Sequence, residues 1–110
     1  MKLNSKFEWK LLGQVQGKDK IIPLPTEEFS ELYVDVNFNE IVVYSFTILS
    51  KFITSTERTH RNGFYNTDGN ENASYSCCNI SCSTSGIKLT HHNVSGIDRE
   101  SLTRITVYYR

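Results

Sequence analysis

The sequence lacks an excess of charge of either sign, a long apolar run and an apolar leader. Its 110 residues include 12 basic and 12 acidic side chains, so we expect no nucleic-acid partner. Apolar runs reach only about five residues, far short of the roughly 20 that a membrane helix requires. The N-terminal residues MKLNSKFEWK carry lysines without an apolar h-region. No signal peptide and no membrane insertion are therefore predicted.

Helical and catalytic patterns are absent as well. No stretch repeats apolar residues at i, i+3 and i+4 over several turns, and no internal repeat is present. The sequence contains no glycine-rich phosphate loop, no G-x-S-x-G and no H-E-x-x-H. These absences favour a protein that is not an enzyme and that uses no cofactor.

Alternating apolar and polar residues run through the stretch Phe29–Ile48. Such period-two alternation is typical of half-buried β-strands, and residues 37–40 supply the turn of an antiparallel hairpin. The residues expected on the buried face are Leu32, Val34, Val36 and Phe38 in the first strand and Val42, Tyr44, Phe46 and Ile48 in the second.

Further strands are predicted on both sides of this hairpin. They are expected at residues 7–15, 20–22, 63–65, 74–82, 87–91 and 102–109, with Leu102, Ile105 and Val107 buried in the last. Gly13 indicates a bulge or a close backbone approach, and Thr26–Phe29 is expected to form one helical turn. We predict a single all-β domain over residues 1–110, with residues 1–6 a loose tail. Its architecture is expected to be an antiparallel, jelly-roll-like β-sandwich or a partly closed barrel of roughly seven to nine short strands.

The chain has three cysteines, and they gather in one predicted strand at Cys77, Cys78 and Cys82. An odd number without a secretory signal favours reduced thiols. Even with His91 and His92 nearby, their spacing matches no zinc pattern. We therefore expect cysteines that fill the core and no metal site, with a metal or a disulfide as the less favoured alternatives.

A thiol nucleophile at Cys77, assisted by His91 or His60, is a distant catalytic alternative, because no local signature orients such a pair. Glu27 and Glu28 are adjacent carboxylates that suit a solvated helix start better than acid–base catalysis.

The segment from Thr59 to Asn72 is rich in Asn, Gly and Thr and is predicted to be a loop. It combines aromatic rings with hydrogen-bonding groups, a mixture that suits a sugar. The candidate ligand-binding residues are His60, Arg61, Phe64, Tyr65 and Asp68. The same composition is typical of any solvated strand connection, so both interpretations stay open.

Three stretches together resemble small β-rich domains of phage or prophage tail, baseplate and tail-fibre proteins from Gram-positive gut bacteria. They are Trp9–Gly13 with Gly17 and Ile21–Pro25, then Phe29–Val34, and finally the ending Ile105–Arg110. The likeness covers nearly the whole chain and is weakest in the cysteine strand and the segment before it.

This resemblance implies a virion structural or host-receptor-binding module, located in the virion or, before assembly, in the bacterial cytoplasm. The implied partners are further copies of the chain (a trimer or a larger ring), other tail proteins and a cell-surface glycan. The shared positions Trp9, Pro25, Leu32 and Tyr109 are expected in the core or at an interface. A free-standing carbohydrate-binding module is the alternative function.

Overall fold

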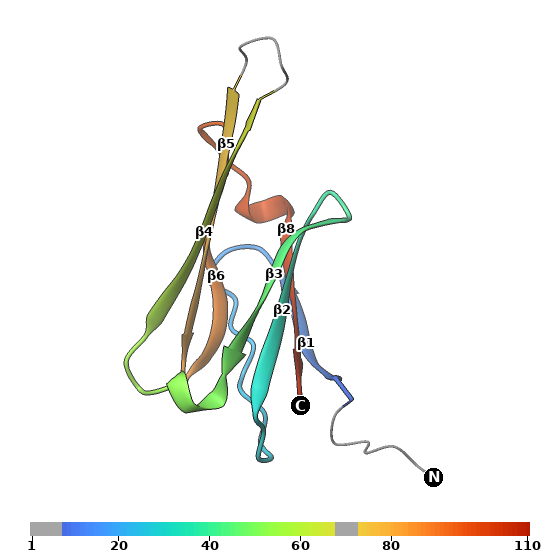
Figure 1. Cartoon of the computed structure of the whole chain (residues 1–110), viewed down its shortest axis with the longest axis vertical. Coiled ribbons are helices and arrows are strands. Elements are labelled where there is room, and N and C mark those ends of the chain that lie inside the picture. Colours follow the sequence, from blue (N-terminus) through green and yellow to red (C-terminus); the bar gives the residue numbers. More distant parts are fainter. Residues whose placement is uncertain (1–7, 68–72) are drawn as a thin grey trace.

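Eight β-strands form two four-stranded antiparallel sheets that face each other (Figure 1). The computed structural model describes residues 8–67 and 73–110, with side chains described outside residues 64–67 and 73–75. The strands are β1 (Lys10–Gln16), β2 (Glu31–Phe38), β3 (Ile41–Leu49), β4 (Arg58–Thr67), β5 (Ala73–Ser83), β6 (Gly86–Val94), β7 (Ile97–Asp98) and β8 (Thr103–Tyr109). The all-β prediction is confirmed, and of the two architectures considered the chain adopts the sandwich.

Sheet A has the strand order β1-β8-β2-β3 and contains the hairpin predicted from the alternation. Its turn consists of Asn39 and Glu40, both with positive φ (53° and 65°), as the tight turn that matches strand twist requires. The predicted inward face of β2 is confirmed, because Leu32, Val34 and Val36 are fully buried.

Sheet B has the order β4-β5-β6-β7, in which each strand pairs with the next along the chain. The inward face of β5 carries Cys78, Ile80 and Cys82, all buried, as their alternation predicted. Ile87 and Leu89 on β6 lie opposite Cys82 and Ile80 and complete this layer of the core.

The segment between β1 and β2 closes one side of the sandwich. Its Ile22 is buried and forms a bridge with Ile87 of β6, with N–H···O distances of 2.8 and 2.9 Å. Gly13 lies against Ile22, and a Cβ at Gly13 would come 2.9 Å from Ile22 Cγ2. The register of β1 also shifts between Leu11 and Gly13, so the predicted bulge and the predicted close approach are both present. The opposite side, between edge strands β3 and β4, has no such cover among the described residues.

Three local predictions are wrong. Thr26–Phe29 forms no helical turn, because Ser30 and Glu31 donate their backbone amides to the carbonyl of Arg110 and hold the segment along β8. Val42 is 53% exposed, because the register shifts where β3 passes Val36 and the alternation changes face there. Leu102 is 50% exposed, because it ends the short 3-10 turn Glu100–Leu102 and does not belong to β8.

The predicted loop over residues 59–72 is also wrong for most of its length. Residues up to Thr67 belong to β4, which pairs with β5 from Arg58↔Cys82 to Thr67↔Ala73. Polar residues are tolerated there because β4 is an edge strand with one solvated face. No helix among the described residues is long and apolar enough to cross a membrane.

Candidate ligand-binding groove

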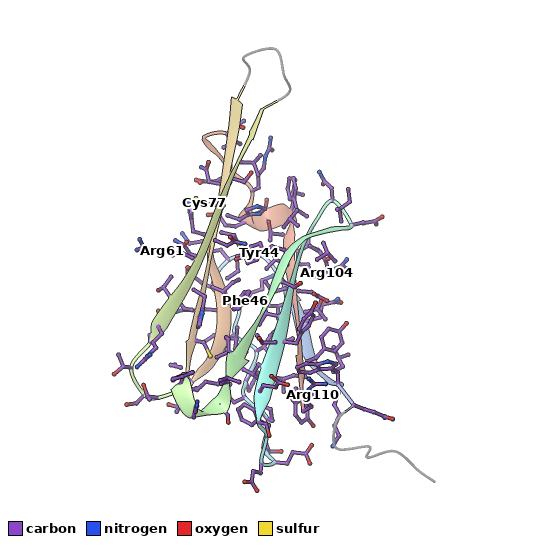
Figure 2. The ribbon with its side chains drawn as sticks, in the orientation of Figure 1. Tyr44, Phe46, Arg61, Cys77, Arg104 and Arg110 are labelled. Atoms are coloured by element: carbon purple, nitrogen blue, oxygen red, sulfur yellow. The ribbon has the colours of Figure 1, made fainter. Side chains whose placement is uncertain are left out.

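Of the five residues predicted to bind a ligand, His60 and Arg61 lie on a strand and not on the expected loop. His60 and Arg61 are consecutive residues of β4, so their side chains leave opposite faces of the strand. His60 lies opposite Ile80 on the inward face, and Arg61 lies on the outer side of β4 (Figure 2). The side chains of Phe64 and Tyr65 and the whole of Asp68 lie outside the described residues.

Rings from both sheets meet at the uncovered side of the sandwich, between β3 and β4. The ring of Tyr44 stacks on Phe46 with centroids 5.8 Å apart, and Phe46 stacks on His60 at 5.3 Å. Figure 2 shows Tyr44 and Phe46 on the side of β3 that faces sheet B. The three rings therefore form a continuous aromatic row that crosses from one sheet to the other.

This row lies along an open groove of about 560 Å³, which we call the edge groove. The groove is lined by Tyr44, Ser45, Phe46, Thr47, Thr59, His60, Arg61 and Asn62. Hydroxyl and amide groups thus border the aromatic row, Arg61 adds a cation from the outer side of β4 (Figure 2), and no carboxylate lies among the described lining residues. A second hollow, also of about 560 Å³, continues past His60 toward Phe52 and Ile53 and is more apolar.

The two ionisable groups of the aromatic row, the Tyr44 hydroxyl and the His60 imidazole, are neutral at physiological pH. Burial raises the pKa of the Tyr44 hydroxyl well above its ordinary value, and this hydroxyl donates to the carbonyl of Cys78 at 3.3 Å. Burial, with Arg58 nearby, lowers the pKa of His60. The His60 imidazole can therefore donate one hydrogen bond and accept another.

The two buried cysteines are core residues. Burial raises the pKa of the Cys78 and Cys82 thiols to about 11, so both are protonated at neutral pH and unreactive. All three cysteines are free. Cys77 lies on the other face of β5, opposite Gly63.

Neither histidine proposed as a base is oriented toward Cys77 by a described contact. His60 lies on the opposite face of the sheet, opposite Ile80, and the Nδ1 of His91 lies 3.7 Å from Glu100 Oε1. The geometry therefore gives the thiol-nucleophile alternative no support.

His92 is a buried structural histidine. Its Nδ1 lies 2.6 Å from Thr103 Oγ1, and that hydroxyl donates its proton to the carbonyl of Arg99 at 2.7 Å. Since a hydroxyl has one proton, Nδ1 of His92 must be the donor in this pair. Phe38 packs edge-on against the imidazole with centroids 5.3 Å apart.

A second aromatic surface covers the outer face of sheet A. Trp9 contacts Tyr33 at 5.4 Å, and Tyr33 contacts Tyr108 at 6.2 Å between ring centroids. The guanidinium of Arg110 lies over Trp9 at 4.1 Å and bonds Glu31 at 2.7 Å. We call these side chains the outer aromatic face; Trp9 thus packs outside the core between the sheets.

A larger hollow, about 790 Å³, lies beside the C-terminal end of β8 and is a weaker candidate site. Its charged groups already bond one another: Glu27 accepts hydrogen bonds from Lys10 at 3.1 Å and from Tyr109 at 2.6 Å. A ligand would have to compete with these pairs.

Sequence reasoning identified His60 and Arg61 but missed Tyr44 and Phe46 as residues that line the groove. The alternation of apolar and polar residues predicted only that Tyr44 and Phe46 are buried. A pattern along one strand does not distinguish an edge strand from a central strand. The available signal was the presence of two aromatic residues, Tyr44 and Phe46, at inward positions of the same strand. The structure shows that this strand, β3, is an edge strand.

Comparisons with protein-family models, with curated proteins and with solved structures found no match to this chain. Function is therefore inferred from the sequence, the fold and the geometry of the described residues.

Proposed function

We propose that the protein is a non-enzymatic receptor-binding module of a phage or prophage tail and that its edge groove binds carbohydrate. The tail assignment rests on the sequence resemblance to tail proteins, and the observation that carries the carbohydrate part is the stacked row of Tyr44, Phe46 and His60 inside a groove with a polar rim. Ligand sites of this kind combine apolar surface with a few placed hydrogen-bonding groups, and a sugar presents both a C–H face and hydroxyls.

The charges of the groove narrow the class of sugar. Arg61 is the one permanent cation among the described lining residues and lies at the rim, on the outer side of β4 (Figure 2), and burial lowers the pKa of His60. We expect neutral or acidic sugars to bind, and cationic amino sugars to be rejected because Arg61 would face a like charge.

A structural role in a tail assembly is the second candidate, supported by the outer aromatic face. Trp, Tyr and Arg are the residues that dominate the energetics of protein interfaces, and here Trp9, Tyr33, Tyr108 and Arg110 are in contact on one face. This candidate predicts a homo-oligomer that uses sheet A as its interface.

A glycan array followed by calorimetry on each hit tests the carbohydrate proposal. Arg61 is exposed and Phe46 is partly buried, so Arg61→Ala tests the groove without disturbing the core, and Phe46→Ala tests the aromatic row. We expect each change to weaken binding at least about tenfold, roughly 1.4 kcal/mol, while Tyr33→Ala on the outer face leaves it unchanged.

The matched variants also separate the two candidates. Binding that survives both groove changes, or an array without hits, contradicts the carbohydrate proposal. Light scattering behind a sizing column tests the second candidate: an oligomer that Tyr33→Ala dissociates supports it, and a monomeric wild-type protein at micromolar concentration contradicts it.

A further inference from the structure

His91, Asp98 and Glu100 converge at one end of sheet B, away from the residues that line the edge groove. They come from β6, from β7 and from the 3-10 turn Glu100–Leu102, the orange-red coil next to β8 in Figure 1. One potential ligand atom from each residue, the imidazole nitrogen and two carboxylate oxygens, lies within 4.8 Å of both others. The Nδ1 of His91 and Oε1 of Glu100 are 3.7 Å apart.

Backbone hydrogen bonds hold this arrangement in place. Ser95 and Gly96 turn the chain with positive φ (52° and 85°), which brings Asp98 opposite Asn93 in the ladder. Asn93 Oδ1 accepts from the amide of Gly96 at 2.8 Å, and its Nδ2 donates to Asp98 Oδ1 at 3.3 Å. The Asp98 carboxylate is therefore oriented by a side chain that is itself fixed.

The following turn places Glu100 in the same way. The amide of Arg99 donates to the carbonyl of His92 at 2.7 Å, and the amide of Leu102 donates to the carbonyl of Arg99 at 3.0 Å. These bonds fold the chain back over β6, so that Glu100 comes to lie beside His91.

Glu100 is the most buried member of this cluster. Its side chain is 11% exposed, and its one ion-pair partner among the described residues is His91, at 3.7 Å. Buried carboxylates are normally hydrogen-bonded, paired or coordinated to metal. A largely buried carboxylate thus lies within 4.8 Å of a second carboxylate, and a cation between them would offset their repulsion.

We propose that His91, Asp98 and Glu100 bind a divalent first-row transition-metal ion. Two carboxylates balance the charge of such an ion, and an imidazole ligand favours zinc, copper, iron or nickel over magnesium and calcium. Ligand atoms that are about 2.1 Å from a metal are about 3.0 to 4.2 Å from one another. The three ligand atoms lie within 4.8 Å of one another, so small side-chain adjustments would bring them to this spacing. The His91 side chain is 36% exposed and Asp98 is exposed, so the ion can enter and keeps positions open to solvent.

Calorimetry and thermal unfolding of the chelator-treated protein with Zn²⁺ or Mn²⁺ test this proposal. We expect one ion per chain with a dissociation constant of about 10 μM or tighter, and a rise in Tm of several degrees because the ion binds only the folded state. Asp98→Asn changes an exposed side chain and should weaken binding at least tenfold, whereas Glu28→Gln, a matched loss of an exposed carboxylate elsewhere, should leave it unchanged.

Two further measurements test whether the ion binds at these three residues and not at the cysteines. Glu100→Gln should abolish the metal-dependent rise in Tm while the metal-free variant stays folded, because a neutral amide is easier to bury. Co²⁺ bound at this site should show no intense thiolate charge-transfer band, which separates it from binding by the cysteines. The proposal is refuted by the absence of saturable one-to-one binding, by equal affinity in Asp98→Asn, or by a thiolate band.

Discussion

A methyl group added at Gly86 should destabilise the fold far more than one added at Gly96. Both glycines have positive φ, 125° and 85°, and both belong to tight connections in sheet B: Gly86 follows the turn before β6, and Gly96 lies in the turn between β6 and β7. They differ in their surroundings. A Cβ at Gly86 would lie 2.5 Å from the carbonyl oxygen of Ile22 and 2.6 Å from Ile21 Cγ2, whereas a Cβ at Gly96 would have no atom within 4 Å.

The expected magnitudes follow from this difference. Positive φ at a non-glycine residue costs about 1–3 kcal/mol, and Gly96→Ala should lose about that much. Gly86→Ala adds a clash with backbone, which must displace the bridge between Ile22 and Ile87. Each of its two hydrogen bonds contributes about 0.5–1.5 kcal/mol, and Ile22 would also leave the core. The two variants should therefore differ by about 2 kcal/mol, a large share of the roughly 5–15 kcal/mol that stabilises a domain.

Urea and thermal unfolding of the wild type and the two variants measure this difference. About 2 kcal/mol corresponds to a separation in Tm of roughly 8 °C for a domain of this size, with Gly86→Ala the lower. If the two variants unfold within about 0.5 kcal/mol of each other, the segment that covers this side of the sandwich does not depend on its contact with Gly86, and the reasoning fails.

Two further predictions concern titratable groups in the core. Burial lowers the pKa of His92, with Glu100 opposing the shift. The unfolded state therefore takes up the proton at a higher pH than the folded state. The contribution of neutral His92 to the free energy of unfolding should be complete above about pH 6.5 and should fall as the pH decreases through that value. Unfolding free energies from pH 7.5 to 5 should show a shallower slope in His92→Gln than in wild type, and equal slopes would contradict this account. Cys78 and Cys82, with thiol pKa values near 11, should react with iodoacetamide only when urea unfolds the protein, as mass spectrometry of the digested chain would show; rapid native labelling of either would contradict their burial.

Much of the fold follows from alternation along single strands. The buried positions of β2 and the cysteine face of β5 were predicted because the two sides of a strand face different surroundings, and that difference appears in the local order of residues. Predictions failed where one extra residue changed the face of a strand, as near Val42, and where a long edge strand had the composition of a loop. Edge strands are the least constrained by burial, so their sequences give the weakest signal.

The candidate sites were less predictable than the strands. His60 and Arg61 were identified by residue type, but their opposite orientations emerged only when β4 proved to be a strand. The proposed metal ligands occur within ten residues of sequence, with His91 at the end of one predicted strand and Asp98 and Glu100 between that strand and the next. The signal available in the sequence was the pair of acidic residues Asp98 and Glu100, which follow a turn and lie near His91 in the sequence.

The alternation of apolar and polar residues was enough to predict the fold class, the principal hairpin and most of the residues that fill the core, because period-two alternation is a local property of the chain. The tertiary structure alone decided which strands form the edges. β1 pairs with β8 across almost the whole chain, with Val15 opposite Ile105, and the Ile22 bridge covers the side that β1 borders. The other side, between β3 and β4, is left as the groove, since a surface assembled from distant residues depends on pairings that no local pattern contains.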